Sequence, residues 1–101
     1  MIVYNITLKI DPEIEKEWIN WQMKEHIPEV MSTKLFSEYK FFHLLEQDET
    51  DGMTYVIQYF TSSIENYDLY IEKFAPLLRK KSNEKWGDSV ISFRTIMKLV
   101  Q

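Results

Sequence analysis

The first ten residues place the strongest constraint on what this chain can fold into. Ile2, Tyr4, Ile6, Leu8 and Ile10 alternate with Val3, Asn5, Thr7 and Lys9. Successive side chains of a β-strand point to opposite faces, so this period of two predicts a strand over residues 2–10 with one fully apolar face. One face of the sheet that contains this strand must then be covered.

A helix is expected to follow the first strand directly. Asp11 suits the N-cap and Pro12 the first helical position, and three glutamates follow near the positive end of the helix dipole. The helix is expected to cover residues 12–31. Pro28 lies inside this pattern and removes a backbone hydrogen bond, so we expect a kink or break near Glu25–His26.

The apolar positions of this helix form two patches at about 100° per residue, where a single stripe would suffice to cover one sheet face. The first patch contains Ile14, Trp18 and Trp21, and the second contains Ile19, Met23, Ile27 and Val30, with His26 at its edge. Two patches indicate that the helix contacts a second partner as well as the sheet.

The rest of the chain predicts two strands, a second helix and a last strand. Residues 36–46 and 53–61 have strand character, and Asp51-Gly52 between them is a hairpin signal. Ser62 and Glu65 resemble a capping box, and apolar residues then recur at helical spacing. Pro76 divides this helix, so a second segment is expected to start near Ala75 and to end at Gly87. Residues 90–100 form the last strand.

The order β-α-β-β-α-β predicts the ferredoxin-like fold of the α+β class. Its sheet is antiparallel and carries both helices on one face. The length of 101 residues fits one domain over residues 1–101.

We predict that the uncovered face of this sheet meets a second copy of the chain. The face is expected to display Val3, Asn5 and Thr7 from the first strand and Arg94, Ile96 and Lys98 from the last. The third strand would add either Val56, Gln58 and Phe60 or Tyr55, Ile57 and Tyr59. This mixture is too apolar for a solvated face and too polar for two sheets pressed flat together, so it predicts a homodimer with a partly open interior.

Composition excludes several classes of function. A net charge of −4, spread along the chain, argues against nucleic-acid binding. Without cysteine there is no disulfide, thiol nucleophile or thiolate metal site. No export signal and no apolar run of bilayer length is visible, so we expect a cytoplasmic protein without membrane contact.

Three stretches resemble a family of short bacterial proteins known as a domain of unknown function with a dimeric α/β-barrel fold. They are Met1-Ile-Val-Tyr-Asn, Trp18-x-x-Trp21-x-x-x-Glu25-His26-Ile27-Pro28, and Ala75-Pro76-x-Leu78-Arg79 continuing to Phe93-Arg94-Thr95. Two positions depart from the pattern, since Phe74 stands where a histidine is expected and Lys34 where a glycine is expected. The first departure weakens the case for a catalytic histidine pair.

The resemblance implies a site but no assigned reaction. Its wider superfamily includes small monooxygenases, isomerase-like and dehalogenase-like enzymes, which share a pocket between sheet and helices in each protomer. We therefore predict that the chain binds a small apolar or aromatic molecule in such a pocket. One alternative is a non-catalytic dimerising interaction module, and another is a cofactor-independent enzyme of monooxygenase or isomerase type. No cofactor is expected.

His26 and Arg94 are the candidate catalytic residues. The ordinary pKa of histidine lies near neutrality, so His26 could act as a general base or acid, or could simply cap the broken helix. Arg94 could hold a carboxylate or a developing oxyanion, or could pair with Glu38 or another acid.

Six further residues are candidates for ligand binding. Trp18 and Trp21 could stack on a flat ligand, although core packing is the simpler interpretation. The polar lining could come from Tyr39, His43, Gln58 and Tyr59, whose direction depends on strand register. A metal site would need His26 and His43 to converge with acids, and their spacing matches no known motif, so none is predicted.

Overall fold

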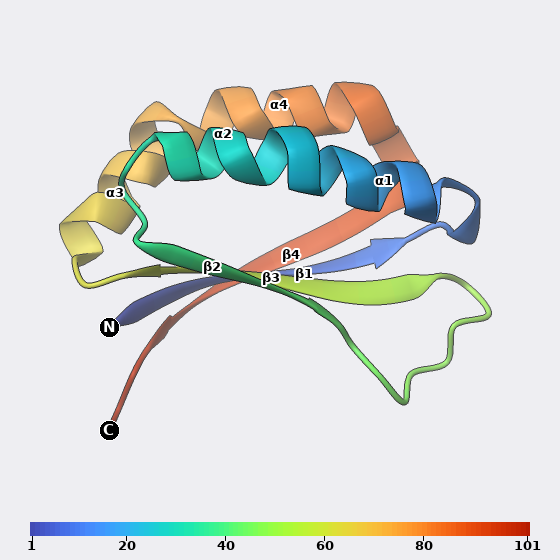
Figure 1. Ribbon diagram of the computed structural model, residues 1–101, viewed down its shortest axis with the longest axis horizontal. Coiled ribbons are helices and arrows are strands. Elements are labelled where there is room, and N and C mark those ends of the chain that lie inside the picture. The colour runs from blue at the N-terminus through green and yellow to red at the C-terminus, as the bar shows by residue number, and fades with distance from the viewer.

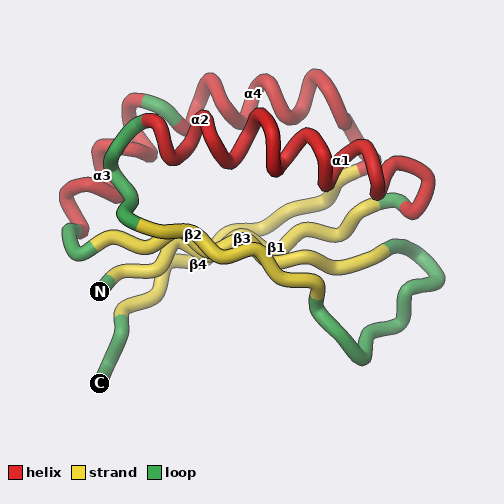
Figure 2. Tube along the Cα trace, viewed as in Figure 1, coloured by secondary structure: helices red, strands yellow, loops and turns green.

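Helices cover one face of a four-stranded antiparallel sheet in the computed structural model, which describes residues 1–101 (Figure 1). The strands are β1 (Ile2–Ile10), β2 (Glu38–His43), β3 (Met53–Thr61) and β4 (Val90–Lys98). The helices are α1 (Glu15–Trp21), α2 (Ile27–Ser32), α3 (Ile64–Lys73) and α4 (Ala75–Trp86). The strand order in the sheet is β2-β3-β1-β4. The predicted ferredoxin-like fold is confirmed, and the face opposite the helices is bare (Figure 2).

Strand β1 lies in the interior of the sheet and supplies much of the core. It pairs with β3 on one side and β4 on the other. Its alternate residues from Tyr4 to Ile10 are buried beneath the helices, as the period of two predicts. Trp18, Ile27 and Val30 pack onto this face from the first helical layer and are almost completely buried. No helix in the structure combines the length and the apolarity that crossing a membrane requires.

The first helix begins and breaks where the sequence predicts. The Asp11 carboxylate accepts a hydrogen bond from the Glu13 backbone N–H at 2.9 Å, and Pro12–Ile14 forms a short 3₁₀ turn. Gln22–His26 forms a π-helical turn between α1 and α2, in which the Ile27 N–H donates to the Gln22 carbonyl five residues earlier. Pro28 has no backbone N–H to donate to a carbonyl earlier in the helix. The regular series of α-helical hydrogen bonds is therefore interrupted here.

The π-helical turn changes which residues face the sheet. Because it adds a residue to the turn, it rotates the following segment relative to a regular helix. The rotation brings Ile27 and Val30 of α2 to the same side as Trp18 and Trp21 of α1, which a regular helical period would separate. Met23 remains outside this side and is 48% exposed. The prediction that Met23 belongs to a packed patch is therefore wrong within the protomer.

The second helix divides at Phe74, which separates α3 from α4, and Pro76 occupies the first turn of α4, as predicted. Ser63, and not Ser62, is the N-cap of α3, since its hydroxyl accepts from the Asn66 N–H at 3.1 Å. Helix α4 ends at Gly87, whose φ of +54° lies in the region that glycine adopts freely.

Strand β2 is shorter than the predicted residues 36–46. Phe36 packs into the core before the strand begins, and the chain after His43 leaves the sheet as a long loop to β3. Lys34 has a φ of +63°, a left-handed conformation that costs a non-glycine residue free energy. The family pattern has a glycine at this position because glycine adopts this conformation without that cost.

The register of β4 corrects the predicted surface of the sheet. Arg94 pairs with Ile6, Ile96 with Tyr4 and Lys98 with Ile2. All three predicted residues of β4 therefore lie on the helix-covered side of the sheet and not on the bare face. The bare face instead displays Ile91, Phe93, Thr95 and Met97 of β4, beside Val3, Asn5 and Thr7 of β1 and Val56, Gln58 and Phe60 of β3. The alternation of β4 could not reveal this, because its more apolar side points away from the helices.

Candidate functional site

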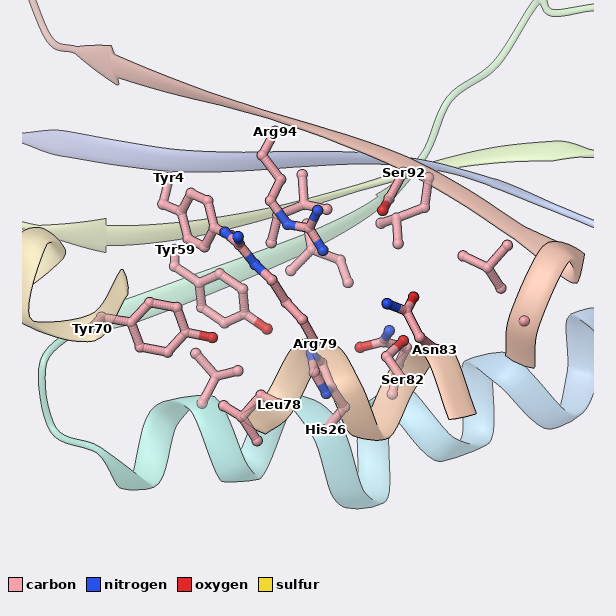
Figure 3. Close-up of a pocket in the computed structure, with 17 residues that line it drawn as sticks. Tyr4, His26, Tyr59, Tyr70, Leu78, Arg79, Ser82, Asn83, Ser92 and Arg94 are labelled. Atoms are coloured by element: carbon pink, nitrogen blue, oxygen red, sulfur yellow. The ribbon is translucent and has the colours of Figure 1, made fainter. Parts of the chain in front are cut away.

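A narrow cleft separates the β1–β4 side of the sheet from the helical layer (Figure 3). Tyr4, Ile6 and Leu8 of β1 line its floor, and the π-helical turn and α4 line the opposite side. Arg94 and Ser92 reach it from the edge strand β4. The cavity has a volume of about 40 Å³, so only a small group fits inside unless its mouth opens.

The π-helical turn aims two polar side chains at the cleft, Gln22 and His26. The His26 ring stacks on Trp21, with ring centroids 4.9 Å apart and planes at 24°, and Trp86 packs edge-on against Trp21 at 5.7 Å. Neither Gln22 Oε1 nor His26 Nδ1 has a hydrogen-bond partner in the protein, although both atoms are buried. Trp21, which itself packs against Trp86, therefore fixes one face of the imidazole, and Nδ1 has no partner within the protein.

His26 is neutral at pH 7. Burial lowers its pKa to about 4 by penalising the charged ring, the nearby Glu29 opposes this, and Arg94 and Lys81 add to it. A neutral imidazole accepts a hydrogen bond or a proton at one nitrogen and donates at the other. Burial therefore makes the ring a weaker base than a solvated imidazole and keeps it as a neutral hydrogen-bonding group in the cleft.

Both arginines of the chain, Arg79 and Arg94, line the cleft. The Arg79 Nη2 group donates to the Tyr4 hydroxyl at 3.0 Å, while its Nε is buried without a partner in the protein. No carboxylate lies within ion-pair distance of either guanidinium, and no acidic side chain lines the cleft. The predicted alternative that Arg94 pairs with Glu38 does not occur within the protomer, because β2 and β4 are opposite edges of the sheet.

Three tyrosines gather at one end of the cleft. The ring centroids of Tyr4 and Tyr59 lie 6.2 Å apart, and those of Tyr4 and Tyr70 lie 5.9 Å apart. Tyr59 is fully buried, and its hydroxyl has no partner in the protein. Burial raises the pKa of Tyr59 well above its ordinary value and also raises the pKa of Tyr70, so both phenols stay protonated and can donate.

The structure brings three of the predicted site residues together in the cleft: His26, Arg94 and Tyr59. Trp18 lies outside it, fully buried against Phe41 and Tyr55. Trp21 also lies outside the lining, but it supports the His26 ring.

The other three predicted residues lie away from the cleft. Tyr39 and His43 are on β2, at the far edge of the sheet, and the His43 ring lies 2.8 Å from the Glu49 carboxylate. Gln58 lies on the bare face and donates to the Asn5 side chain at 3.2 Å. No three histidine, aspartate and glutamate side chains gather where they could hold a metal ion.

Sequence reasoning missed several residues of the cleft, notably Gln22, Arg79 and Tyr70. Arg79 stands in one of the stretches that carry the family resemblance, which is a signal that could have singled it out. Gln22 follows Trp18 by four residues, so regular helical spacing places it on the same side, and this position is the signal that could have singled it out.

A family model described as "Domain of unknown function (DUF4286)" matches residues 1–100. The chain belongs to this family. No protein of curated function matches the chain. The family membership confirms the resemblance seen in the sequence and carries no assigned activity with it.

Solved structures share the fold of this family member at low sequence identity. An ethyl tert-butyl ether d (ethd) family protein from Bacillus halodurans superposes with a TM-score of 0.69 at 14% identity, over 99% of this chain and 100% of that one. A hydroxynitrile lyase from Passiflora edulis gives 0.63 at 15% identity, over 99% and 96%. A dimeric ferredoxin-like protein from an uncultured marine organism gives 0.62 at 9% identity, over 99% and 95%. Likeness at this identity shows the fold alone.

Proposed function

We propose that the protein binds a small molecule in the cleft between sheet and helices. The observation that carries this proposal is the concentration of unpartnered polar atoms there. Of the six buried side-chain polar atoms without a partner in the protein, four belong to residues that line the cleft: Gln22, His26, Tyr59 and Arg79. Buried polar groups are nearly always hydrogen-bonded, so four such atoms around one cavity favour a polar occupant.

The two histidines provide a matched test of this proposal. In native mass spectrometry of protein purified from its own host, we expect an additional mass that is lost in His26→Ala and kept in His43→Ala. His26 lines the cleft, whereas His43 is half-exposed on β2. Circular dichroism should show the same fold in both variants. If both variants keep the added mass, or if the wild-type protein carries none and binds nothing offered, the cleft is not a ligand site.

Proton-transfer catalysis without a cofactor is a second candidate function. The observation that favours it is a neutral imidazole with a free buried Nδ1, fixed by Trp21 and near the Arg94 cation. A neutral imidazole can accept a proton while a cation stabilises the anion that forms, and an anion formed beside the ring would raise its lowered pKa toward neutrality. The Passiflora protein with this fold is described as a lyase, which is compatible with such chemistry but does not assign it.

We further propose that the bare sheet face joins two copies of the chain. Ile91 and Phe93 on this face are 66% and 64% exposed in the protomer, and Phe42 and Met97 more than 40%. Three of the strands have nine residues, so the face extends about 30 Å by about 20 Å. Such an area approaches the roughly 800 Å² per partner that a stable interface buries. The marine protein of similar fold is described as dimeric.

A negative charge introduced on the bare sheet face is expected to dissociate the dimer into monomers. Wild-type protein should sediment at twice the chain mass of 12.3 kDa, and Phe93→Glu should sediment as a monomer, because a carboxylate would be buried against an apolar face. Leu77→Glu is the matched control, since Leu77 is similarly exposed at 60% but lies on α4. A monomeric wild-type protein at micromolar concentration would refute the dimer. A dimer that binds no small molecule would favour the interaction-module alternative.

A further inference from the structure

The charge distribution of the cleft is opposite to that of the whole protein. The chain has a net charge of −4, with 16 acidic residues, and only two arginines. Both arginines line the cleft, and none of the acidic residues does. The ion pairs of the structure, such as Lys81 with Glu29 at 2.9 Å, all involve other cations. The cleft is therefore a local concentration of uncompensated positive charge.

The two guanidinium groups have far more donors than partners. Each carries five N–H donors in a planar fork, and the structure gives them one side-chain hydrogen bond, from Arg79 to the Tyr4 hydroxyl. That acceptor is neutral, so it leaves the charge of Arg79 uncompensated. A partly buried cation is costly unless an anion accompanies it. The side chain of Arg94 enters the same cleft from the opposite wall, as Figure 3 shows.

A third donor of the cleft also suits an anion. The hydroxyl of Tyr59 is buried without a partner and can donate to a ligand, whereas the unpartnered atom of Gln22 is Oε1, which can only accept. No carboxylate in the lining would repel a negative ligand. The apolar side chains Val30, Ile57 and Leu78 provide room for an uncharged body beside these donors.

We infer that the ligand of this cleft is a carboxylate, clamped between Arg79 of α4 and Arg94 of β4. This inference rests on the proposed small-molecule site and names the chemical class of its ligand. A carboxylate is planar and accepts two parallel, charge-assisted hydrogen bonds from one guanidinium. The corresponding neutral amide cannot, because its nitrogen is a donor. Arg94 is exposed at the edge of the sheet and contacts the ligand from the mouth, whereas the half-buried Arg79 contacts it from within.

Isosteric acids and amides test the inference directly. Calorimetric titration in phosphate-free buffer should show binding of benzoate or propionate, and at least about tenfold weaker binding of benzamide or propionamide, because the amides cannot form the charge-assisted hydrogen bonds. The smaller pair is included because the cavity is only about 40 Å³. Equal affinity for acid and amide would overturn the inference and leave the small-molecule site standing. Binding of neither member of either pair would count against the proposed site itself.

Charge-removing variants assign the effect to the two arginines. Arg79→Gln and Arg94→Gln should each weaken acid binding about tenfold or more and weaken amide binding much less, because only the acid loses a charge-assisted hydrogen bond. Lys98→Gln is the control, because it removes the same charge from β4 outside the cleft. Arg94 is exposed, so its substitution leaves folding intact even if Arg79→Gln does not. Equal weakening by Lys98→Gln would show that net charge, and not the clamp, attracts the acid.

Discussion

Replacing Trp18 by alanine is expected to lower the free energy of unfolding by about 3–5 kcal/mol. Trp18 has 0% exposure, and its ring lies 5.4 Å from Tyr55 and 5.7 Å from Phe41, measured between centroids. Alanine would leave a large cavity between helix and sheet. Since a domain of this size is stable by only about 5–15 kcal/mol, this loss would bring the protein close to unfolding. Urea denaturation followed by circular dichroism measures it.

Met23→Ala is the control for this prediction, because Met23 belongs to the adjoining π-helical turn but is 48% exposed. Its effect on the free energy of unfolding should stay within about 0.5 kcal/mol. A Trp18→Ala protein of unchanged stability that no longer binds a ligand would contradict the core role. It would support the alternative in which the indole stacks on a ligand.

The sequence predicts the fold because each element satisfies a local rule. The alternation of residues 2–10 and the Asp11-Pro12 start confine the chain to a strand followed by a helix. Both helix breaks are predictable for the same reason, because Pro28 and Pro76 lack the backbone N–H that a helix interior needs. These features depend on neighbouring residues alone.

The site is only partly predictable, because its geometry depends on two non-local choices. One is the π-helical turn, which brings Ile27 and Val30 to the side of Trp18 and Trp21 against the regular helical period and leaves Met23 exposed. The other is the register of β4, which turns Arg94 toward the helices. On β4 both faces mix polar and apolar residues, so the burial pattern cannot decide the direction, and only pairing with β1 does.

The chemistry available to Arg94 depends on which face of the sheet it occupies. On the bare face it would be a charge at a dimer interface, with an acid of the partner as its expected counterpart. On the helix-covered face it lies in the same cleft as His26 and Arg79. Arg94 can be singled out from the sequence as a candidate. The pairing of β4 with β1 determines which side chains surround it and hence what chemistry it can support.

The stability of the protein is expected to fall by about 3 kcal/mol through His26 alone as the pH drops from about 6.5 to about 4. The unfolded chain binds a proton at His26 below pH 6.5, whereas in the folded chain burial lowers the pKa to about 4. Between these values the unfolded state binds more protons, so the stability rises with pH. It is fully present above pH 6.5 and is lost as the pH falls.

Comparing variants isolates this contribution from the titration of carboxylates. His26→Gln should lose the slope between pH 4 and 6.5, while His43→Gln, at the half-exposed histidine of β2, should keep it. Both variants retain every acidic residue, so acid titration is common to the two curves apart from Glu29 beside His26 and Glu49 beside His43. If His26→Gln keeps the slope, the ring is solvated or paired in the folded protein. The imidazole would then not be the neutral, desolvated base that a proton-transfer role for the cleft requires.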